Sequence, residues 1–251
     1  MTPSQPQDLH PDTLAVRQAL PRSVYGEHSE ALYLTSSFVQ PDAETAARRF
    51  AGEEDGYTYT RTSNPTVTSF EQRLAAMEGT ESAIGTSSGM SAILLMCLGL
   101  LKAGDHVVCS QSMFGSTIKL IGGELSRFGV ESSFVPQTDS SAWKAALRPN
   151  TRLLFAETPT NPLTDLCDIA ELAAIAHGAG VLLAVDNCFA SPALQRPAML
   201  GADLVIHSAT KFLDGQGRVL GGAVCGPKKL TEEVFKYLRT AGPTLSAFNA
   251  W

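Results

Sequence analysis

Short apolar runs alternate with amphipathic segments along most of this chain. Seven runs show little polar alternation and predict buried strands at 83–84, 106–109, 133–135, 152–156, 181–185, 204–206 and 222–224. Between them, apolar residues recur at helical spacing and predict helices at 91–101, 117–128, 142–147 and 169–177. Buried strands separated by amphipathic helices are typical of a mostly parallel sheet that is covered on both faces. The pattern therefore predicts a three-layer α/β/α core over roughly 82–226.

The segments that flank this core have different patterns. Residues 1–60 are rich in proline, glutamine, serine, threonine and charge, with one short helical pattern at 12–20, and predict an extended N-terminal arm. Such an arm usually needs another surface to order it, which favours an oligomer, with packing inside the same domain as the alternative. Residues 61–241 are predicted to form one large domain, including a helix that ends at Gly79 and another at 229–239. Residues 242–251 are expected to begin the connection to a C-terminal domain that this chain lacks.

Composition limits the possible partners and the compartment. A chain of 251 residues with 44% hydrophobic content can bury a full core. Its net charge of −6 supplies no basic face for nucleic acid or an anionic membrane, so a small-molecule partner is favoured. The start of the chain lacks the features of a signal peptide, and no window approaches the ~18 apolar residues of a membrane span. These features predict a cytoplasmic protein.

The cysteines agree with that compartment. The chain has five of them, an odd number, and they are widely spaced and mostly embedded in apolar runs. This usage favours reduced, packed thiols over disulfides. No two of them form a Cys-x-x-Cys pair, so no metal site is predicted.

Polar residues that directly follow the predicted strands are the candidates for chemistry, because parallel sheets bind ligands beyond the carboxyl ends of their strands. The glycine-rich motifs of dinucleotide and P-loop sites are absent from the sequence. Instead, 87–90 (SSGM) follows a strand and opens a helix, where backbone N–H groups and the positive helix end could hold a phosphate. An ordinary N-cap at Ser88 is the alternative.

Two further strand ends carry charged side chains. Asp186 ends an apolar run, where a buried carboxylate requires a cation or hydrogen-bond donors. The protonated pyridine nitrogen of pyridoxal phosphate (PLP) is such a cation, although Asp186 could equally cap the next turn. Ser208 and Thr210 could donate to phosphate oxygens while Lys211 reaches the aldehyde carbon. A neutral lysine amine of this kind needs a desolvated site, and a solvated loop lysine is the alternative.

Five runs together resemble the Cys/Met-metabolism PLP-dependent enzymes, the cystathionine γ-synthase group. They occur in the family's order, the resemblance covers about 50–251, and the runs are 57–66 (YTYTRTSNPT), 87–90 (SSGM), 157–162 (ETPTNP), 186–187 (DN) and 208–211 (SATK). The resemblance implies a fold-type I PLP-dependent transferase-like fold. It also implies a homodimer or homotetramer whose active sites are shared between subunits.

The resemblance assigns a role to each candidate residue. Lys211 would bind PLP as a Schiff base, and Asp186 would contact the pyridine nitrogen. The phosphate would lie among Ser88, Gly89, Met90, Ser208 and Thr210. Asn161 would lie near the phenolic oxygen of the ring. Tyr59 and Arg61 would reach the phosphate of a neighbouring subunit, with a surface aromatic beside a solvated charge as the alternative.

Phe114 stands where many members of the group have a tyrosine. Its ring can still stack on the cofactor, but proton transfer must then depend on Lys211. This difference, together with residues 207–218, resembles the O-succinylhomoserine sulfhydrylases more than the lyases. It implies γ-replacement of succinate by sulfide on an amino-acid substrate, which forms homocysteine in methionine biosynthesis. The alternatives are a cystathionine γ-synthase, a γ- or β-lyase of the same group, or a non-catalytic fragment, because members of the group continue into a C-terminal domain that grips the substrate carboxylate.

Overall fold

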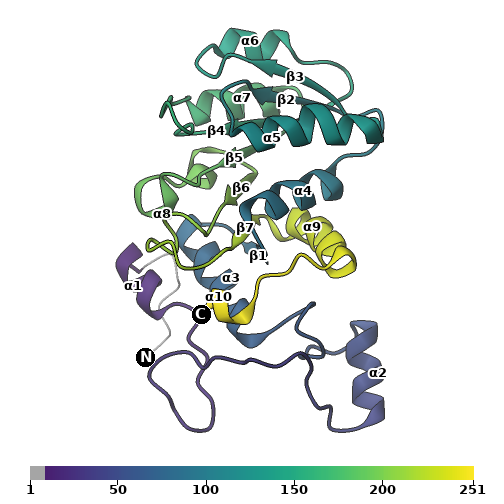
Figure 1. The fold of residues 1–251 in the computed structure, drawn as a ribbon, viewed down its shortest axis with the longest axis vertical. Helices are drawn as coiled ribbons and strands as arrows, with labels where there is room; N and C mark the ends of the chain where they lie inside the picture. Colours follow the sequence, from purple (N-terminus) through teal and green to yellow (C-terminus); the bar gives the residue numbers. More distant parts are fainter. Residues whose placement is uncertain (1–8) are drawn as a thin grey trace.

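A seven-stranded sheet forms the centre of the molecule (Figure 1). A computed structural model describes residues 9–251, so the first eight residues of the predicted arm lie outside the described residues. The strand order is β1-β7-β6-β5-β4-β2-β3, and β7 alone runs antiparallel to its neighbours. The strands are β1 (Ser82–Thr86), β2 (His106–Ser110), β3 (Glu131–Val135), β4 (Thr151–Glu157), β5 (Leu182–Asp186), β6 (Leu204–His207) and β7 (Gly222–Gly226). The predicted mostly parallel sheet is confirmed, and each predicted run overlaps a strand, with 181–185 beginning one residue before β5.

Helices cover both faces of this sheet. Side chains of β4 alternate between two buried clusters, so that Leu153 and Phe155 pack in one while Leu154 and Ala156 pack in the other. The first cluster includes residues of α4 (Gly89–Leu100) and α9 (Lys228–Ala241), and α5 (Gly115–Lys119) packs against it. On the opposite face lie α3 (Pro65–Glu78), α6 (Ser140–Ala145) and α7 (Ile169–Gly178). The three-layer prediction is therefore confirmed.

Two of the helical predictions correspond closely to the structure. The helix α3 ends at Gly79, which adopts a left-handed conformation with φ 77°, as the pattern predicted. The helix predicted for 117–128 is confirmed as continuous helical backbone, although it changes from α5 to a π-helical turn (Leu120–Glu124) and then a 3-10 turn (Leu125–Phe128). Gly122 and Gly123 lie within the π-helical turn, and glycine is a weak helix former.

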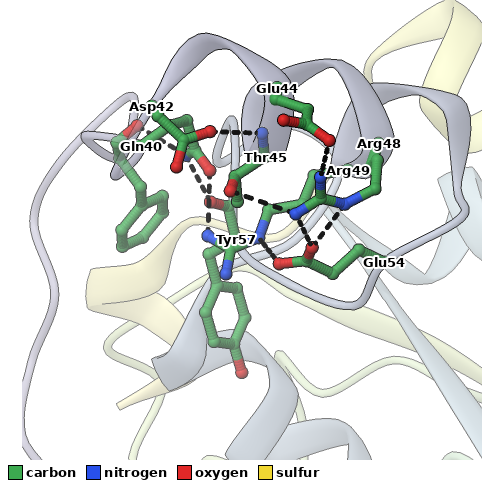
Figure 2. Close-up of polar contacts among 9 residues, drawn as sticks. Gln40, Asp42, Glu44, Thr45, Arg48, Arg49, Glu54 and Tyr57 are labelled. Atoms are coloured by element: carbon green, nitrogen blue, oxygen red, sulfur yellow. Dashed lines mark hydrogen bonds and ion pairs between the residues drawn. The ribbon is translucent and has the colours of Figure 1, made fainter.

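The N-terminal arm contains more structure than the sequence indicated. The helix α1 (Pro11–Arg17) matches the predicted pattern, but α2 (Ala43–Ala51) was not predicted. Asp42 caps α2 by accepting the Thr45 N–H at 2.7 Å, and Arg48 and Arg49 both bind Glu54 at the other end (Figure 2). Its apolar residues at 43, 46, 47 and 50 recur at helical spacing, so a short helical signal was present in this polar segment and was overlooked. The arm lies at the end of the molecule opposite β3 (Figure 1).

The remaining helices are short. They are α8 (Ser191–Leu194), a 3-10 turn (Pro197–Leu200) and α10 (Ala247–Ala250). Near the end of the chain, Leu245 and Ala247 are buried against Val67 of α3. No helix among residues 9–251 is long and apolar enough to cross a membrane.

Candidate cofactor site

Three strand ends meet at one edge of the sheet. Glu157 ends β4 and lies in register with Asp186, which ends the neighbouring strand β5. Side chains alternate along a strand, so both carboxylates lie on the face covered by α4 and α9. His207 ends β6 and is directed to the opposite face, where it meets Glu78 of α3. The predicted concentration of polar groups at this edge is therefore present, on both sides of the sheet.

Asp186 is a buried carboxylate without a cationic partner. Its side chain is 8% exposed and accepts the Cys188 N–H at 3.0 Å, so it does cap the next turn. Among residues 9–251, no lysine, arginine or histidine forms an ion pair with it. Burial raises the pKa of Asp186 to about 7, and the nearby Glu157 charge contributes. The folded chain thus holds an acidic group that is complementary to a cation.

The start of α4 adjoins the loop after β6. Ser88 is the N-cap of α4 and accepts the Ser91 N–H at 3.1 Å. The N–H groups of Gly89 and Met90 have no acceptor in the described part of the chain. A Cβ atom on Gly89 would lie 2.7 Å from the Ser208 Cβ, so only glycine permits this approach. Free backbone donors and the Ser208 side chain are thereby brought together.

Thr210 and Lys211 differ in part from the predictions. The Thr210 hydroxyl donates to the Gly221 carbonyl and accepts the Gly221 N–H, both at 3.2 Å, so its donor is already used within the chain. Lys211 is exposed, because it lies in a surface turn after β6, and the predicted desolvated setting is not formed by residues 9–251. Its charge nevertheless acts on Cys188, two positions after Asp186. Burial and the Asp186 charge raise the pKa of the Cys188 thiol to about 12, and the Lys211 charge opposes this rise.

Glu157 joins Phe114 and Asn161, two residues singled out from the sequence. It accepts the Phe114 N–H at 2.6 Å through Oε2 and the Asn161 N–H at 3.0 Å through Oε1. Burial raises the pKa of Glu157, and these two hydrogen bonds oppose the rise. Sequence reasoning assigned Glu157 no role. Its position at the end of a buried strand, the same signal that identified Asp186, could have found it.

Tyr59 and Arg61 belong to another cavity. They line a space of about 790 Å³ together with residues of the arm and of α9, and neither Asp186 nor Lys211 lines it. The Arg61 guanidinium lies over the Tyr59 ring, 5.4 Å from its centroid, and donates to the Arg239 carbonyl. These two side chains thus contact each other and α9, rather than the other candidate residues of the same chain.

Comparison with known proteins decides the family. Residues 12–251 match the family model described as Cys/Met metabolism PLP-dependent enzyme. The chain belongs to this family. Its cofactor is therefore PLP, which was the prediction from the strand ends.

Individual relatives agree with this assignment. The chain is 58% identical to an O-succinylhomoserine sulfhydrylase of Pseudomonas aeruginosa, over 96% of this chain and 60% of that protein. It is 43% identical to an L-methionine γ-lyase of Treponema denticola, over 92% of this chain and 58% of that protein. The metY crystal structure from Campylobacter jejuni contains N'-pyridoxyl-lysine-5'-monophosphate and superposes with a TM-score of 0.92 at 29% identity, over 97% of this chain and 69% of that one. The chain spans about 60% of the length of the curated relatives that it matches.

The residues of this family member fit its cofactor. Asp186 is buried and acidic, and none of residues 9–251 supplies it with a counter-ion, which complements a protonated ring nitrogen. The unused N–H groups of Gly89 and Met90 lie at a helix N-terminus beside Ser208, which complements a phosphate. An anionic group and a cationic ring atom are thus accommodated by neighbouring elements of one sheet edge.

A buried network supports the site from the other face. Glu78 Oε1 binds His207 Nε2 at 2.6 Å and accepts the Asn187 side-chain amide at 3.0 Å, and all three side chains are fully buried. Asn187 follows Asp186, and His207 precedes Ser208. No sequence pattern indicated this network, because Glu78 lies 129 positions from His207.

Removal of the Glu78 carboxylate is expected to destabilise the whole domain. Glu78→Ala leaves the buried His207 and Asn187 side chains without their shared acceptor, which corresponds to a loss of about 3 kcal/mol of unfolding free energy. Urea unfolding followed by circular dichroism measures this loss. Glu124→Ala, which removes an exposed ion pair with Arg127, is the control and should change stability by less than about 1 kcal/mol. Equal effects of the two substitutions would contradict a supporting role for Glu78.

Proposed function

We propose that this chain is the cofactor-binding part of an enzyme that converts O-succinylhomoserine and sulfide into homocysteine and succinate. The observation that carries the proposal is the 58% identity to an O-succinylhomoserine sulfhydrylase over nearly the whole chain. The buried Asp186 beside the start of α4 supports the cofactor part of the proposal. A γ-lyase activity is the second candidate, because relatives named L-methionine γ-lyase are 42–43% identical.

Each candidate residue has a proposed task. Lys211 would hold PLP covalently through Nζ, and Asp186 would hold the pyridine nitrogen in its protonated form. The N–H groups of Gly89 and Met90, with the Ser208 hydroxyl, would bind the phosphate next to Ser88. When bound, PLP supplies an electron sink that stabilises negative charge on substrate carbons near the amine. We propose that Thr210 orients the turn through Gly221 and supplies at most a secondary contact.

Proton transfer would depend on one amine. Phe114 has no hydroxyl, so its half-exposed ring could stack on the cofactor but could not move a proton. The Lys211 Nζ would accept the proton from the substrate Cα, and it would return a proton later in the reaction. Asn161, whose backbone is fixed by Glu157, would place its side chain near the phenolic oxygen. These tasks leave Lys211 as the one proton carrier among the candidate residues.

A second subunit would complete the site. Tyr59 and Arg61 line a cavity that excludes Asp186 and Lys211, which supports a role for them in a neighbouring copy of the chain. The ion pairs of Glu54 with Arg48 and Arg49 brace the adjoining part of the arm (Figure 2). We therefore propose a homodimer or homotetramer in which each arm serves the site of another subunit.

The products formed by the chain test the reaction. With PLP, O-succinylhomoserine and sulfide, homocysteine and succinate are expected, at a rate about 100-fold or more below that of the Pseudomonas aeruginosa relative. The low rate is expected because groups that bind the substrate carboxylate would belong to the part of the relatives that this chain does not span, and a lost charged contact of about 3 kcal/mol corresponds to this factor.

Product ratios separate the alternatives. Release of 2-oxobutyrate and ammonia without homocysteine in the presence of sulfide would refute γ-replacement and favour the lyase. Homocysteine synthesis at the rate of the relative would contradict the need for further substrate-binding groups. Thiol derivatisation with chromatography measures homocysteine, and a dehydrogenase-coupled assay measures the keto acid.

A further inference from the structure

Glu157 connects the parts of the candidate site that would surround the cofactor ring. It is 5% exposed, and no cationic side chain in the described part of the chain pairs with it. Its two oxygens accept the N–H groups of Phe114, at the start of α5, and of Asn161, in the loop after β4. Its strand position is in register with Asp186. A single carboxylate thus links three elements.

The contacts of Glu157 fix main chain rather than side chains. The Phe114 N–H lies 2.6 Å from Oε2, and the Asn161 N–H lies 3.0 Å from Oε1, so each oxygen serves one loop. Hydrogen bonds to an ionised carboxylate are stronger than neutral ones. A side-chain amide has only one acceptor oxygen, so it could satisfy one loop while presenting a donor to the other. Two acceptors at this position are therefore needed to hold both loops.

Charge gives Glu157 a second effect on the site. The titratable groups that act on Asp186 are Glu157 on β4 and Cys188 directly after β5, and the Lys211 charge in the turn after β6 acts on Cys188. After burial, the Glu157 charge is the next largest cause that raises the pKa of Asp186. Two neighbouring carboxylates produce a more negative potential than one, which favours a cation placed beside them.

We propose that Glu157 is a positioning residue of the cofactor site, which holds the Phe114 and Asn161 backbones beside the ring and strengthens the negative potential around Asp186. This inference rests on the proposed PLP site. Glu157 would act on the cofactor site through Phe114, Asn161 and Asp186, and it would not contact the substrate.

The substitution Glu157→Gln tests both effects. PLP affinity, measured by absorbance titration of the cofactor-free chain at pH 8, is expected to fall about 10-fold. Amide hydrogen exchange at Phe114 or Asn161 should accelerate in the cofactor-free protein, while the Cys188 amide, which is bonded to Asp186, should keep its protection. Glu131→Gln, an exposed strand carboxylate paired with Arg148, is the matched control and should leave all values unchanged.

The pH dependence of PLP affinity distinguishes the charge effect of Glu157 from a general loss of structure. Binding of a ring cation requires ionised Asp186, so wild-type affinity should fall as the pH decreases through about 7. Without the Glu157 charge, Asp186 ionises at a lower pH, and this acid limb should shift to lower pH. Glu157→Asp retains the charge and should keep the limb near its wild-type position while accelerating exchange in one loop. If Glu157→Gln does not fold, Glu157→Asp still tests whether Glu157 holds the loops.

The outcomes distinguish the inference from the proposed function. A wild-type chain that takes up no PLP would overturn the proposed site, and with it this role of Glu157. A wild-type chain that binds PLP, with Glu157→Gln unchanged in affinity, acid limb and amide exchange, would overturn the inference alone. A uniform loss of affinity without a shift of the acid limb would refute the charge effect.

Discussion

Substitution of Lys211 by alanine is expected to abolish covalent attachment of PLP and the visible absorbance band of the loaded protein. The reason is that Lys211 carries the one side-chain amine among the predicted site residues, and its charge acts on Cys188, two positions after Asp186. Loss of proton transfer by this amine alone should lower turnover by about 10²–10⁴-fold. Absorbance spectra before and after borohydride treatment, followed by peptide mass analysis, measure attachment directly.

The stability of the Lys211→Ala variant should remain close to that of the wild type. Lys211 is exposed and its side chain forms no ion pair among residues 9–251, so unfolding free energy should change by about 0.5 kcal/mol or less. Lys236→Ala, which removes an exposed lysine paired with Glu233 on α9, is the control and should retain the absorbance band. A band that persists in Lys211→Ala, or a PLP-modified peptide that lacks Lys211, would refute the assignment.

Substitution of Asp186 by asparagine is expected to stabilise the cofactor-free chain while it impairs the loaded one. Burial, and then the Glu157 charge, raise the pKa of Asp186 from 3.8 to about 7. As the pH rises through this window, the unfolded chain loses the Asp186 proton before the folded chain does, so stability falls and the whole cost is present above pH 7. At 1.36 kcal/mol per pH unit, the cost has an upper bound of about 4 kcal/mol.

Urea unfolding of the cofactor-free proteins at two pH values tests this sign. Asp186→Asn should be more stable than wild type at pH 8, and the gain should decrease toward pH 4. Asp139→Asn is the opposite control, because hydrogen bonds from Ser141 and Ala142 lower the pKa of that exposed residue, and no gain is expected there. A stability difference for Asp186→Asn that does not change with pH would contradict an uncompensated carboxylate.

The loaded Asp186→Asn protein should have weaker PLP binding and slower turnover. An amide cannot offset the charge of a protonated ring nitrogen, so turnover should fall by about 100-fold, the equivalent of ~2.7 kcal/mol in activation free energy. The same side chain would thus lower the stability of the empty protein and promote the chemistry of the loaded one. Residues that lower the stability of a protein while they serve its function are common at functional sites.

The fold was largely predictable because its information is local. A run such as 204–206 has no polar alternation, since β6 is buried on both faces, and the period of each helix is visible in the positions of its apolar residues. The helix α2 was missed although residues 43, 46, 47 and 50 recur at helical spacing, because this apolar stripe is short and lies in a polar segment. The helix predicted at 117–128 formed, and two adjacent glycines lie where its geometry is π-helical rather than α-helical.

The sequence by itself determined the sheet, the strand ends and the identity of Asp186, Ser208 and Lys211 as candidates, because a polar residue directly after an apolar run is visible without coordinates. Only the tertiary structure decided which of these groups meet. Glu157 binds Phe114 across 43 positions of the chain, and Glu78 binds His207 across 129. It also decided that Lys211 is exposed and that the Thr210 hydroxyl faces Gly221. Contacts of this kind depend on how strands and helices pack, and residues that are distant along the chain carry no periodic signal of their partners.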